Sequence, residues 1–190
     1  MRNDGPVWKA KLKDHYLLMK FTLSFTVVFS SVISYLLVPG VRFDIIQVLS
    51  LFIGGMLVTG SANAINQVVE KDTDALMRRT SSRPVAAGRM SADEAWTFAG
   101  VAGILGIFLL GWTFNVLTAV IAAFSLFLYG FVYTPLKKVH SIAVLVGAIP
   151  GALPCLIGWV AGAGALTMGG WILFSLQFFW QFPQIGRAHV

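Results

Sequence analysis

A dense group of polar and charged residues begins at Asn66, directly after a long apolar segment. If this part of the chain is helical, Asn66, Glu70 and Asp74 share one face, because Glu70 and Asp74 are rotated by only about 40° and 80° from Asn66. Asn63 falls on the same stripe at about 60°, whereas Asp72 points to the other side at about 240°. We expect Asn66, Glu70 and Asp74 to act together on the ligand. We expect Asn63 and Asp72 to support these three residues without contacting the ligand themselves.

These three side chains offer only oxygen ligands, with no histidine or cysteine among them. Hard oxygen ligands suit magnesium, which binds through few carboxylates and shares its coordination shell with phosphate oxygens. Arg79 and Arg83 follow, and a guanidinium group matches phosphate oxygens in a bidentate manner. The segment therefore predicts a catalytic magnesium site, formed by Asn66, Glu70 and Asp74, that binds a diphosphate.

A second charged loop contains Lys137 and Lys138, at the end of another apolar segment. These lysines could bind the far phosphate as point charges. Anchoring of a cytoplasmic loop by basic residues explains them equally well. Both interpretations stay open from the sequence.

The Asn66 to Arg83 segment could also be an ordinary solvated loop, since loops on the cytoplasmic side of a membrane are basic. Such a loop needs no acidic stripe at helical spacing. Asn63 and Asn66 also extend the stripe back into apolar sequence, where polar groups are costly unless they have a function. We therefore favour a functional site.

The composition indicates an integral membrane protein, with 57% hydrophobic residues, 12% charged residues and a mean hydropathy of +0.78. We predict an all-α, polytopic bundle of transmembrane helices, because several apolar segments are long enough to cross about 30 Å of hydrocarbon. A tight turn at 111–115 separates the third and fourth segments. The six predicted spans are Tyr16 to Val38, Ile45 to Val69, Ala92 to Trp112, Thr113 to Tyr133, Ser141 to Ala161 and Met168 to Phe182.

The net charge of +6 is distributed unevenly among the loops. If the N-terminus is cytoplasmic, basic residues gather before or within the start of the first span and in the loops at 70–89 and 137–138, and the opposite short loops carry only Arg42. This asymmetry predicts that the N-terminus and both charged loops are cytoplasmic, in the cell's inner or plasma membrane. It explains the basic pI by contact with the lipid bilayer, so no nucleic-acid partner is expected.

Glycines and prolines interrupt the fifth segment at Gly147, Pro150, Gly151, Pro154 and Gly158. Small residues allow helices to approach closely, and prolines free carbonyl groups that a cavity or a neighbouring helix must satisfy. The pattern is compatible with a wide intramembrane pocket and with simple close packing. An amphiphile with a diphosphate head and a hydrocarbon tail fits these parts, with its head at the magnesium and diphosphate site and its tail in the bundle.

The chain resembles the UbiA-type intramembrane prenyltransferases, and within that family the haem O synthase branch. The likeness covers nearly the whole sequence up to Pro183 and lies in three blocks. The blocks comprise Asn66 to Asp74 with Met77, Arg79, Thr80, Arg83, Pro84 and Gly88; Tyr133, Thr134, Leu136 to Lys138, Gly147, Gly151, Pro154 and Gly158; and Trp180 to Pro183.

The resemblance implies a magnesium-dependent enzyme that joins farnesyl diphosphate to the vinyl group of haem B, giving haem O for terminal oxidase assembly. Glu70 stands where much of the family has aspartate, so the carboxylate is kept. The resemblance also implies nine transmembrane helices, with a second acidic motif after the sixth. On this basis residues 1–183 form a single, incomplete prenyltransferase domain, and the 190-residue chain alone is expected to be inactive. Residues 184–190 are polar and unlike the apolar sequence before them, so we interpret them as a cloning or sequencing scar.

Two other functions share some of these features. A related prenyltransferase acting on an aromatic or quinone precursor would need the same diphosphate site. A transporter would instead place acidic residues near mid-membrane in several helices and repeat the pattern internally. Here Glu70, Asp72 and Asp74 lie at the end of one predicted helix, which favours the enzyme.

Overall fold

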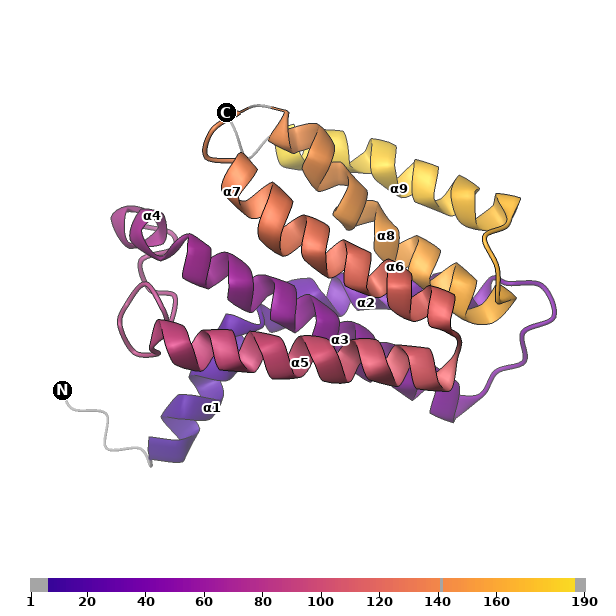
Figure 1. Cartoon of the computed structure of the whole chain (residues 1–190), viewed down its shortest axis with the longest axis horizontal. Coiled ribbons are helices and arrows are strands. Elements are labelled where there is room, and N and C mark those ends of the chain that lie inside the picture. Colours follow the sequence, from indigo (N-terminus) through magenta and orange to yellow (C-terminus); the bar gives the residue numbers. More distant parts are fainter. Residues whose placement is uncertain (1–6, 141, 187–190) are drawn as a thin grey trace.

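The computed structural model describes residues 7–140 and 142–186, and all regular structure in these residues is helical (Figure 1). The all-α prediction is confirmed. The elements are α1 (Val7–Leu18), α2 (Phe21–Leu36), α3 (Ile45–Val69), α4 (Lys71–Leu76), α5 (Ala92–Thr113), α6 (Val116–Phe127), the π-helical segment η1 (Leu128–Tyr133), α7 (Thr134–Leu136), α8 (Ala143–Ala163) and α9 (Met168–Gly186).

Four helices within the described residues are long and apolar enough to cross a membrane, and a bent α1–α2 pair could supply a fifth crossing. The protein is thus a multi-pass membrane protein, with fewer supported crossings than the six predicted. The sixth predicted span does form a helix, α9, but its hydropathy is too low for it to count among them. The four are α3, α5, α8 and the continuous segment Val116–Leu136.

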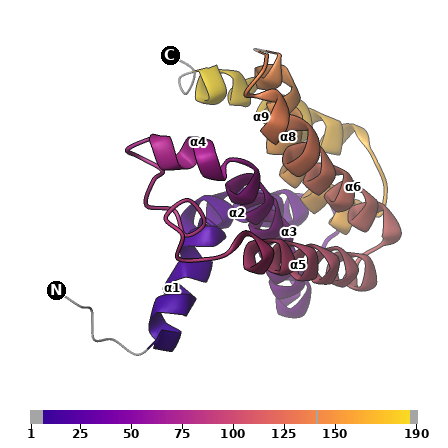
Figure 2. The same ribbon diagram turned by 60° about the vertical axis from the view of Figure 1, so that its left-hand side comes forward.

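The long helices lie side by side, and the central α3 contacts most of the others (Figures 1 and 2). The most extensive contacts join α3 to α5, α8 to α9, and α2 to both α8 and α3. The main apolar core fills the space between these helices and includes the fully buried Leu51, Leu110 and Val160. A second apolar cluster lies nearer the end that carries α4.

Side-chain caps fix where three helices begin. The Asp44 carboxylate accepts hydrogen bonds from the first turn of α3, and the Ser91 hydroxyl accepts one from the Glu94 amide in α5. The Asn115 side chain accepts a hydrogen bond from the Thr118 amide at 2.8 Å, which starts α6 directly after α5. Such caps satisfy amide groups that a helix leaves unpaired at its N-terminus. A tight turn is therefore present within the predicted 111–115, but it comprises only Phe114 and Asn115, because α5 continues to Thr113.

The small residues of α8 serve close packing. A β-carbon at Gly151 would lie 2.7 Å from the Gln181 side chain of α9, and one at Gly158 would lie 2.7 Å from the carbonyl carbon of Ser31 in α2. Gly147 faces the Tyr133 ring at an even shorter separation. The helix continues through Pro150 and its second proline without interruption. Of the two interpretations of these residues, the structure supports close packing along α8.

The first predicted span, over residues 16–38, is wrong as a single helix. Two helices form there instead, and they are bent by 50° relative to each other at Met19 and Lys20. The Ser24 hydroxyl, in the first turn of α2, donates to the carbonyl of Met19 at 2.7 Å. A hydrogen bond between residues on the two sides of the break therefore stabilises it.

Amide side chains of α3 hold this break from the other side. The Gln67 amide nitrogen donates to the carbonyls of Leu17 at 3.1 Å and Leu18 at 2.9 Å, and the Asn63 amide nitrogen donates to the carbonyl of Met19 at 3.1 Å. Carbonyl groups at the end of a helix lack partners inside the helix, so they need such donors when water is excluded. Polar residues of α3 thus fix the position of a turn that lies more than forty residues earlier in the chain.

Candidate active site

The predicted acidic stripe lies at a helix break. α3 ends at Val69, Glu70 has φ −98° and ψ 5°, and the short α4 begins at the next residue. The assumption of one continuous helix from Asn66 to Asp74 is therefore wrong. The helical hydrogen bonds survive the break, because the Glu70 amide donates to the Asn66 carbonyl at 3.0 Å and the Asp74 amide donates to the Glu70 carbonyl at 2.7 Å. The two carboxylates consequently stay on the same side and are only 6% and 4% exposed.

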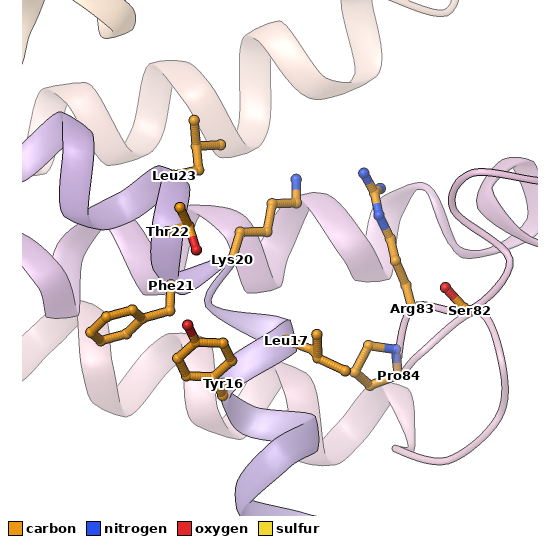
Figure 3. Close-up of a pocket in the computed structure, with 9 residues that line it drawn as sticks. All are labelled: Tyr16, Leu17, Lys20, Phe21, Thr22, Leu23, Ser82, Arg83 and Pro84. Carbon is orange, nitrogen blue, oxygen red and sulfur yellow. The ribbon is translucent and has the colours of Figure 1, made fainter.

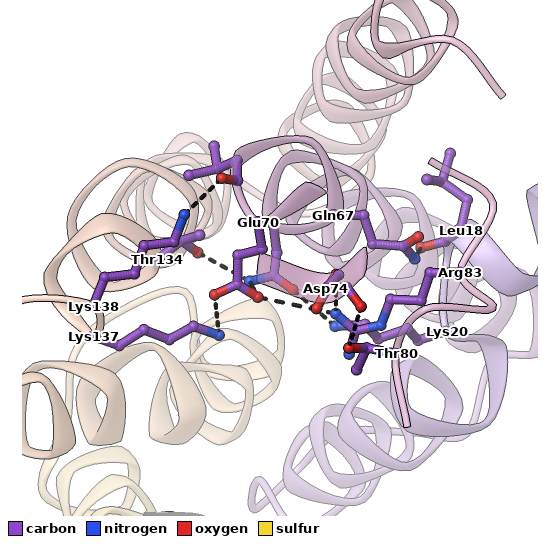
Figure 4. A network of polar contacts seen from close by, with 12 residues as sticks. Leu18, Lys20, Gln67, Glu70, Asp74, Thr80, Arg83, Thr134, Lys137 and Lys138 are labelled. Carbon is purple, nitrogen blue, oxygen red and sulfur yellow. Dashed lines mark hydrogen bonds and ion pairs between the residues drawn. The ribbon is translucent and has the colours of Figure 1, made fainter. Parts of the chain in front are cut away.

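Two cations pair with these carboxylates, Arg83 from the loop that follows them and Lys137 from the second charged loop (Figure 4). Arg83 reaches the Asp74 carboxylate at 2.5 Å and lies 4.0 Å from that of Glu70. Lys137 reaches the other oxygen of Glu70 at 2.6 Å. Buried carboxylates are stable only when they are paired and hydrogen-bonded. The two charged loops therefore meet at one end of the bundle, as the charge distribution predicted.

The Asn66 side chain, 1% exposed, connects the two halves of this cluster. Its amide nitrogen donates to the Glu70 carboxylate at 2.9 Å and, at the longer distance of 3.5 Å, to the Thr134 hydroxyl. Its oxygen accepts a hydrogen bond from the Lys20 ammonium at 2.9 Å. Sequence reasoning treated the basic residues at the start of the first span, Lys20 among them, only as membrane-flanking cations and missed this contact. The available signal was a lysine inside otherwise apolar sequence with no acidic neighbour.

A π-helical segment positions Lys137. α6 widens into η1, and the Thr134 hydroxyl donates to the carbonyl of Tyr129 at 2.8 Å, five residues earlier. Short π-helical insertions are rare and frequently lie at functional sites. The Lys137 ammonium also lies 5.6 Å from the centre of the Tyr133 ring, within the range of a cation–π contact. Thr134 and η1 were not identified as site features from the sequence.

The remaining predicted site residues do not pair with the two carboxylates. Asn63 holds the α1–α2 break and does not contact the carboxylates in the described part of the chain. Asp72 is exposed, consistent with its predicted orientation away from Asp74. Arg79 is exposed and makes no ion pair or side-chain hydrogen bond to a described residue, so the structure does not bring it into the cluster. Lys138 is exposed and donates to the carbonyl of Val69 at 2.8 Å, which caps the end of α3.

Apolar contacts hold the loop that carries Arg83. Val85 and Met90 are 3% and 4% exposed and pack in the second apolar cluster with Leu18. The buried Thr80 hydroxyl donates to the carbonyl of Asp74 at 3.0 Å. These contacts keep the guanidinium group beside the carboxylates although the loop has no long helix of its own.

A cavity of about 360 Å³ adjoins the polar cluster (Figure 3). Lys20 and Arg83 border it and their cationic ends point in the same direction. The rest of its wall is mainly apolar, with Ser82 and Thr22 as polar additions. Its apolar lining residues are Tyr16, Leu17, Phe21, Leu23 and Pro84. A cavity with this lining can receive an anionic group next to an apolar one.

The charges around the two carboxylates do not balance. Glu70 and Asp74 face three cations, Lys20, Arg83 and Lys137, so positive charge is in excess. Within the described residues no further carboxylate is buried. A partly buried excess of positive charge favours binding of an anion. The arrangement differs from that of a transporter with acidic residues in several helices.

The chemistry of the donors suits magnesium, although the described residues contain no group of three or more acidic, histidine or cysteine side chains able to hold a metal ion. The oxygen atoms of Asn66, Glu70 and Asp74 are hard ligands on buried side chains, and the Arg83 guanidinium contacts both carboxylates. Magnesium needs few protein ligands when phosphate oxygens and water complete its shell. The site fits such a shared ion.

Comparison with known proteins decides the family. A sequence model of the UbiA prenyltransferase family matches residues 27–186. The chain belongs to the UbiA prenyltransferase family. Among its UbiA relatives, the protoheme IX farnesyltransferase of Christiangramia forsetii is 46% identical over 90% of this chain, and that of Flavobacterium johnsoniae is 48% identical over 92%. This chain spans 57% and 59% of the lengths of these two relatives.

Solved structures of UbiA-like proteins have the same fold. A structure described as a digeranylgeranylglyceryl phosphate synthase has a TM-score of 0.77 and 27% identity, covering 91% of this chain and 60% of its own. A UbiA homologue from Archaeoglobus fulgidus, bound to DMAPP and Mg2+, has a TM-score of 0.70 and 15% identity, covering 87% of this chain and 59% of its own. The helices of the present chain therefore adopt the UbiA arrangement.

Proposed function

We propose that the protein to which this chain belongs transfers the farnesyl group of farnesyl diphosphate to a vinyl group of haem B, giving haem O for terminal oxidase assembly. The observation that carries the diphosphate part is the buried pair Glu70 and Asp74 surrounded by an excess of cations. The acceptor rests on the relatives, since protoheme IX farnesyltransferases match at 46% and 48% identity over at least 90% of this chain.

In the proposed reaction, the bond between the allylic carbon and the diphosphate oxygen breaks, and diphosphate leaves with the electron pair. The vinyl group supplies two electrons for the new carbon–carbon bond, and water adds hydroxide to the resulting cation and releases a proton. Arg83 and Lys137 are placed to hold the departing diphosphate, because preorganised cations stabilise the charge that develops on it. Arg79 and Lys138 are exposed and pair with neither carboxylate, so they would act on the diphosphate only through the overall positive charge of their loops.

Magnesium would be held by Asn66, Glu70 and Asp74 and would neutralise charge on the leaving group. This assignment agrees with the donor chemistry of the site and with the magnesium described for the Archaeoglobus homologue. Asn63 and Asp72 would act further out, Asn63 by holding the α1–α2 break. We further propose that the end of the bundle carrying the site faces the cytoplasm, because both charged loops lie there.

The direct test is a product assay on a version of the protein extended to the length of its relatives. With farnesyl diphosphate, magnesium and haem B we expect a product whose mass equals haem B plus a farnesyl group and a hydroxyl group. With 4-hydroxybenzoate in place of haem B we expect no product. Farnesylated 4-hydroxybenzoate without haem O would replace the proposed acceptor by an aromatic one, and the 190-residue chain should be inactive in both assays.

Replacing Lys137 with methionine should weaken use of farnesyl diphosphate more than replacing Lys138 in the same way. Lys137 is paired with a buried carboxylate, whereas Lys138 is exposed and caps a helix. Loss of one hydrogen bond to a charged group is typically worth about 1.5–3 kcal/mol, or roughly 10- to 150-fold. The measurement is kcat/KM for farnesyl diphosphate. Equal effects of the two substitutions would show that only the overall charge of the loop matters.

A further inference from the structure

Lys20 contacts the polar cluster, although a lysine that only anchors a loop at the membrane surface needs no such contact. Its ammonium points into the polar cluster and donates to the oxygen of Asn66 at 2.9 Å (Figure 4). The amide side chains of Gln67 and Asn63 hold the preceding carbonyls and thereby fix the direction in which Lys20 leaves the chain. Several buried polar groups of α3 thus serve to place this one cation.

The backbone at Lys20 is also unusual. Its φ of 48° and ψ of 56° are left-handed, and among the described residues it is the only non-glycine residue with positive φ. Glycine adopts this conformation without cost, whereas a residue with a β-carbon does not. Strained residues tend to persist at functional positions. A lysine here therefore indicates that the side chain itself is needed.

Among the described residues, no carboxylate forms an ion pair with Lys20. Glu70 and Asp74 are already paired with Lys137 and Arg83, and the contact of Lys20 is a neutral amide oxygen. The two carboxylates attract the Lys20 ammonium from a distance, but the positive charges of Arg83 and Lys137 oppose that attraction. In this partly buried setting an ammonium group gains most from a bound anion.

The same amide oxygen is the ligand atom that Asn66 could offer to a metal, because its amide nitrogen is turned toward Glu70. A divalent cation on this oxygen would repel the ammonium. We propose that Lys20 is a diphosphate-binding residue that changes partners: it holds the Asn66 oxygen in the free protein and moves to a phosphate oxygen when the metal and diphosphate bind. This role rests on the proposed function and adds a residue to it.

Figure 3 shows the cavity into which the Lys20 ammonium would turn. The Lys20 and Arg83 side chains run alongside each other at the wall of the 360 Å³ cavity and end on the same side of it. An anion between their ends would be bound by two cations that come from different parts of the chain. Because Lys20 lies at the α1–α2 break, binding of the anion would then contact this break directly.

The test uses the extended protein in lipid nanodiscs and measures binding of inorganic pyrophosphate by calorimetry, with and without magnesium. Lys20→Met removes the ammonium, and Lys20→Gly removes it while suiting the left-handed backbone. We expect both variants to bind pyrophosphate at least about tenfold more weakly. Lys20→Arg should retain most of the affinity, and Lys13→Met, which changes an exposed lysine of α1, should match the wild type.

Two further readouts separate ligand binding from a purely structural role. The unfolding midpoint of Lys20→Gly should equal or exceed that of the wild type, because strain is removed. Binding of magnesium alone should not weaken in Lys20→Met, because the Asn66 oxygen loses a competitor. If both variants instead lost stability and bound every ligand poorly, Lys20 would be structural only.

The outcomes distinguish this inference from the proposed function. If the wild type binds pyrophosphate and Lys20→Met and Lys20→Gly bind it within twofold of the wild type, the role of Lys20 is rejected and the proposed function stands. If the wild type itself binds no pyrophosphate in the presence of magnesium, the proposed function and the role of Lys20 are rejected together.

Discussion

Replacing Asp74 with asparagine is expected to reduce farnesyl transfer severely in the extended protein. Asp74 is 4% exposed, pairs with Arg83 at 2.5 Å and is one of the three proposed magnesium ligands. The substitution keeps the shape of the side chain but removes its charge, so both the metal and the guanidinium group lose a partner. We expect kcat/KM to fall by roughly 10²- to 10³-fold or more, the range known for loss of one preorganised electrostatic contact. Haem O formation under saturating magnesium measures it.

Asp72→Asn is the matched control, since it makes the same chemical change at an exposed residue two positions earlier. We expect it to retain most of the activity. A second comparison is the magnesium concentration needed for half-maximal rate, which should rise for Asp74→Asn only. Equal and mild effects of the two substitutions would contradict the assignment of Asp74 to the metal and the argument that the two residues face opposite ways.

Gly158→Ala should be the most destabilising small substitution in the bundle. A β-carbon there would lie 2.7 Å from the carbonyl carbon of Ser31 and closer still to its oxygen, so α2 and α8 would have to separate. Backbone atoms cannot move aside as a flexible side chain can. Overpacking of this kind typically costs 1–3 kcal/mol and occasionally more, and we expect about 3 kcal/mol. The free energy of unfolding in mixed detergent micelles, followed by helix circular dichroism, measures the loss.

Gly100→Ala provides the control, because a β-carbon at this helical glycine of α5 meets no atom within 4 Å. Alanine has the higher helix propensity, so this variant should be at least as stable as the wild type. If Gly158→Ala were equally stable, α2 and α8 could not cross as closely as the structure has them. In that outcome we also expect the enzymatic activity to be unchanged by Gly158→Ala.

Local features of the sequence predicted several elements well. The span predicted from Ile45 to Val69 coincides with α3, and α5 begins at the predicted Ala92. Apolar length and capping residues act over one or two turns, so they can be recognised without knowledge of the neighbouring helices. The acidic stripe was also correctly placed at a helix end, because its periodicity is a local property as well.

Other features depend on partners far away in the chain. The apolar run at 16–38 looks like one helix, and its break at Lys20 becomes visible only when Asn63 and Gln67 of α3 are seen to donate to the carbonyls there. The break within the acidic stripe at Glu70 has a similar origin, since Lys138 caps the end of α3 from another loop. Hydropathy and helical periodicity depend only on residues that are close in the sequence, so they cannot reveal such contacts.

The sequence by itself determined the membrane class, most helix positions and the face shared by Asn66, Glu70 and Asp74. Only the tertiary structure decided which cations complete the site: it brought in Lys20, favoured Lys137 over Lys138, and left Arg79 exposed. The physical reason is that burying a carboxylate requires a partner within a few ångströms. Which of many basic residues meets that requirement depends on how the helices pack.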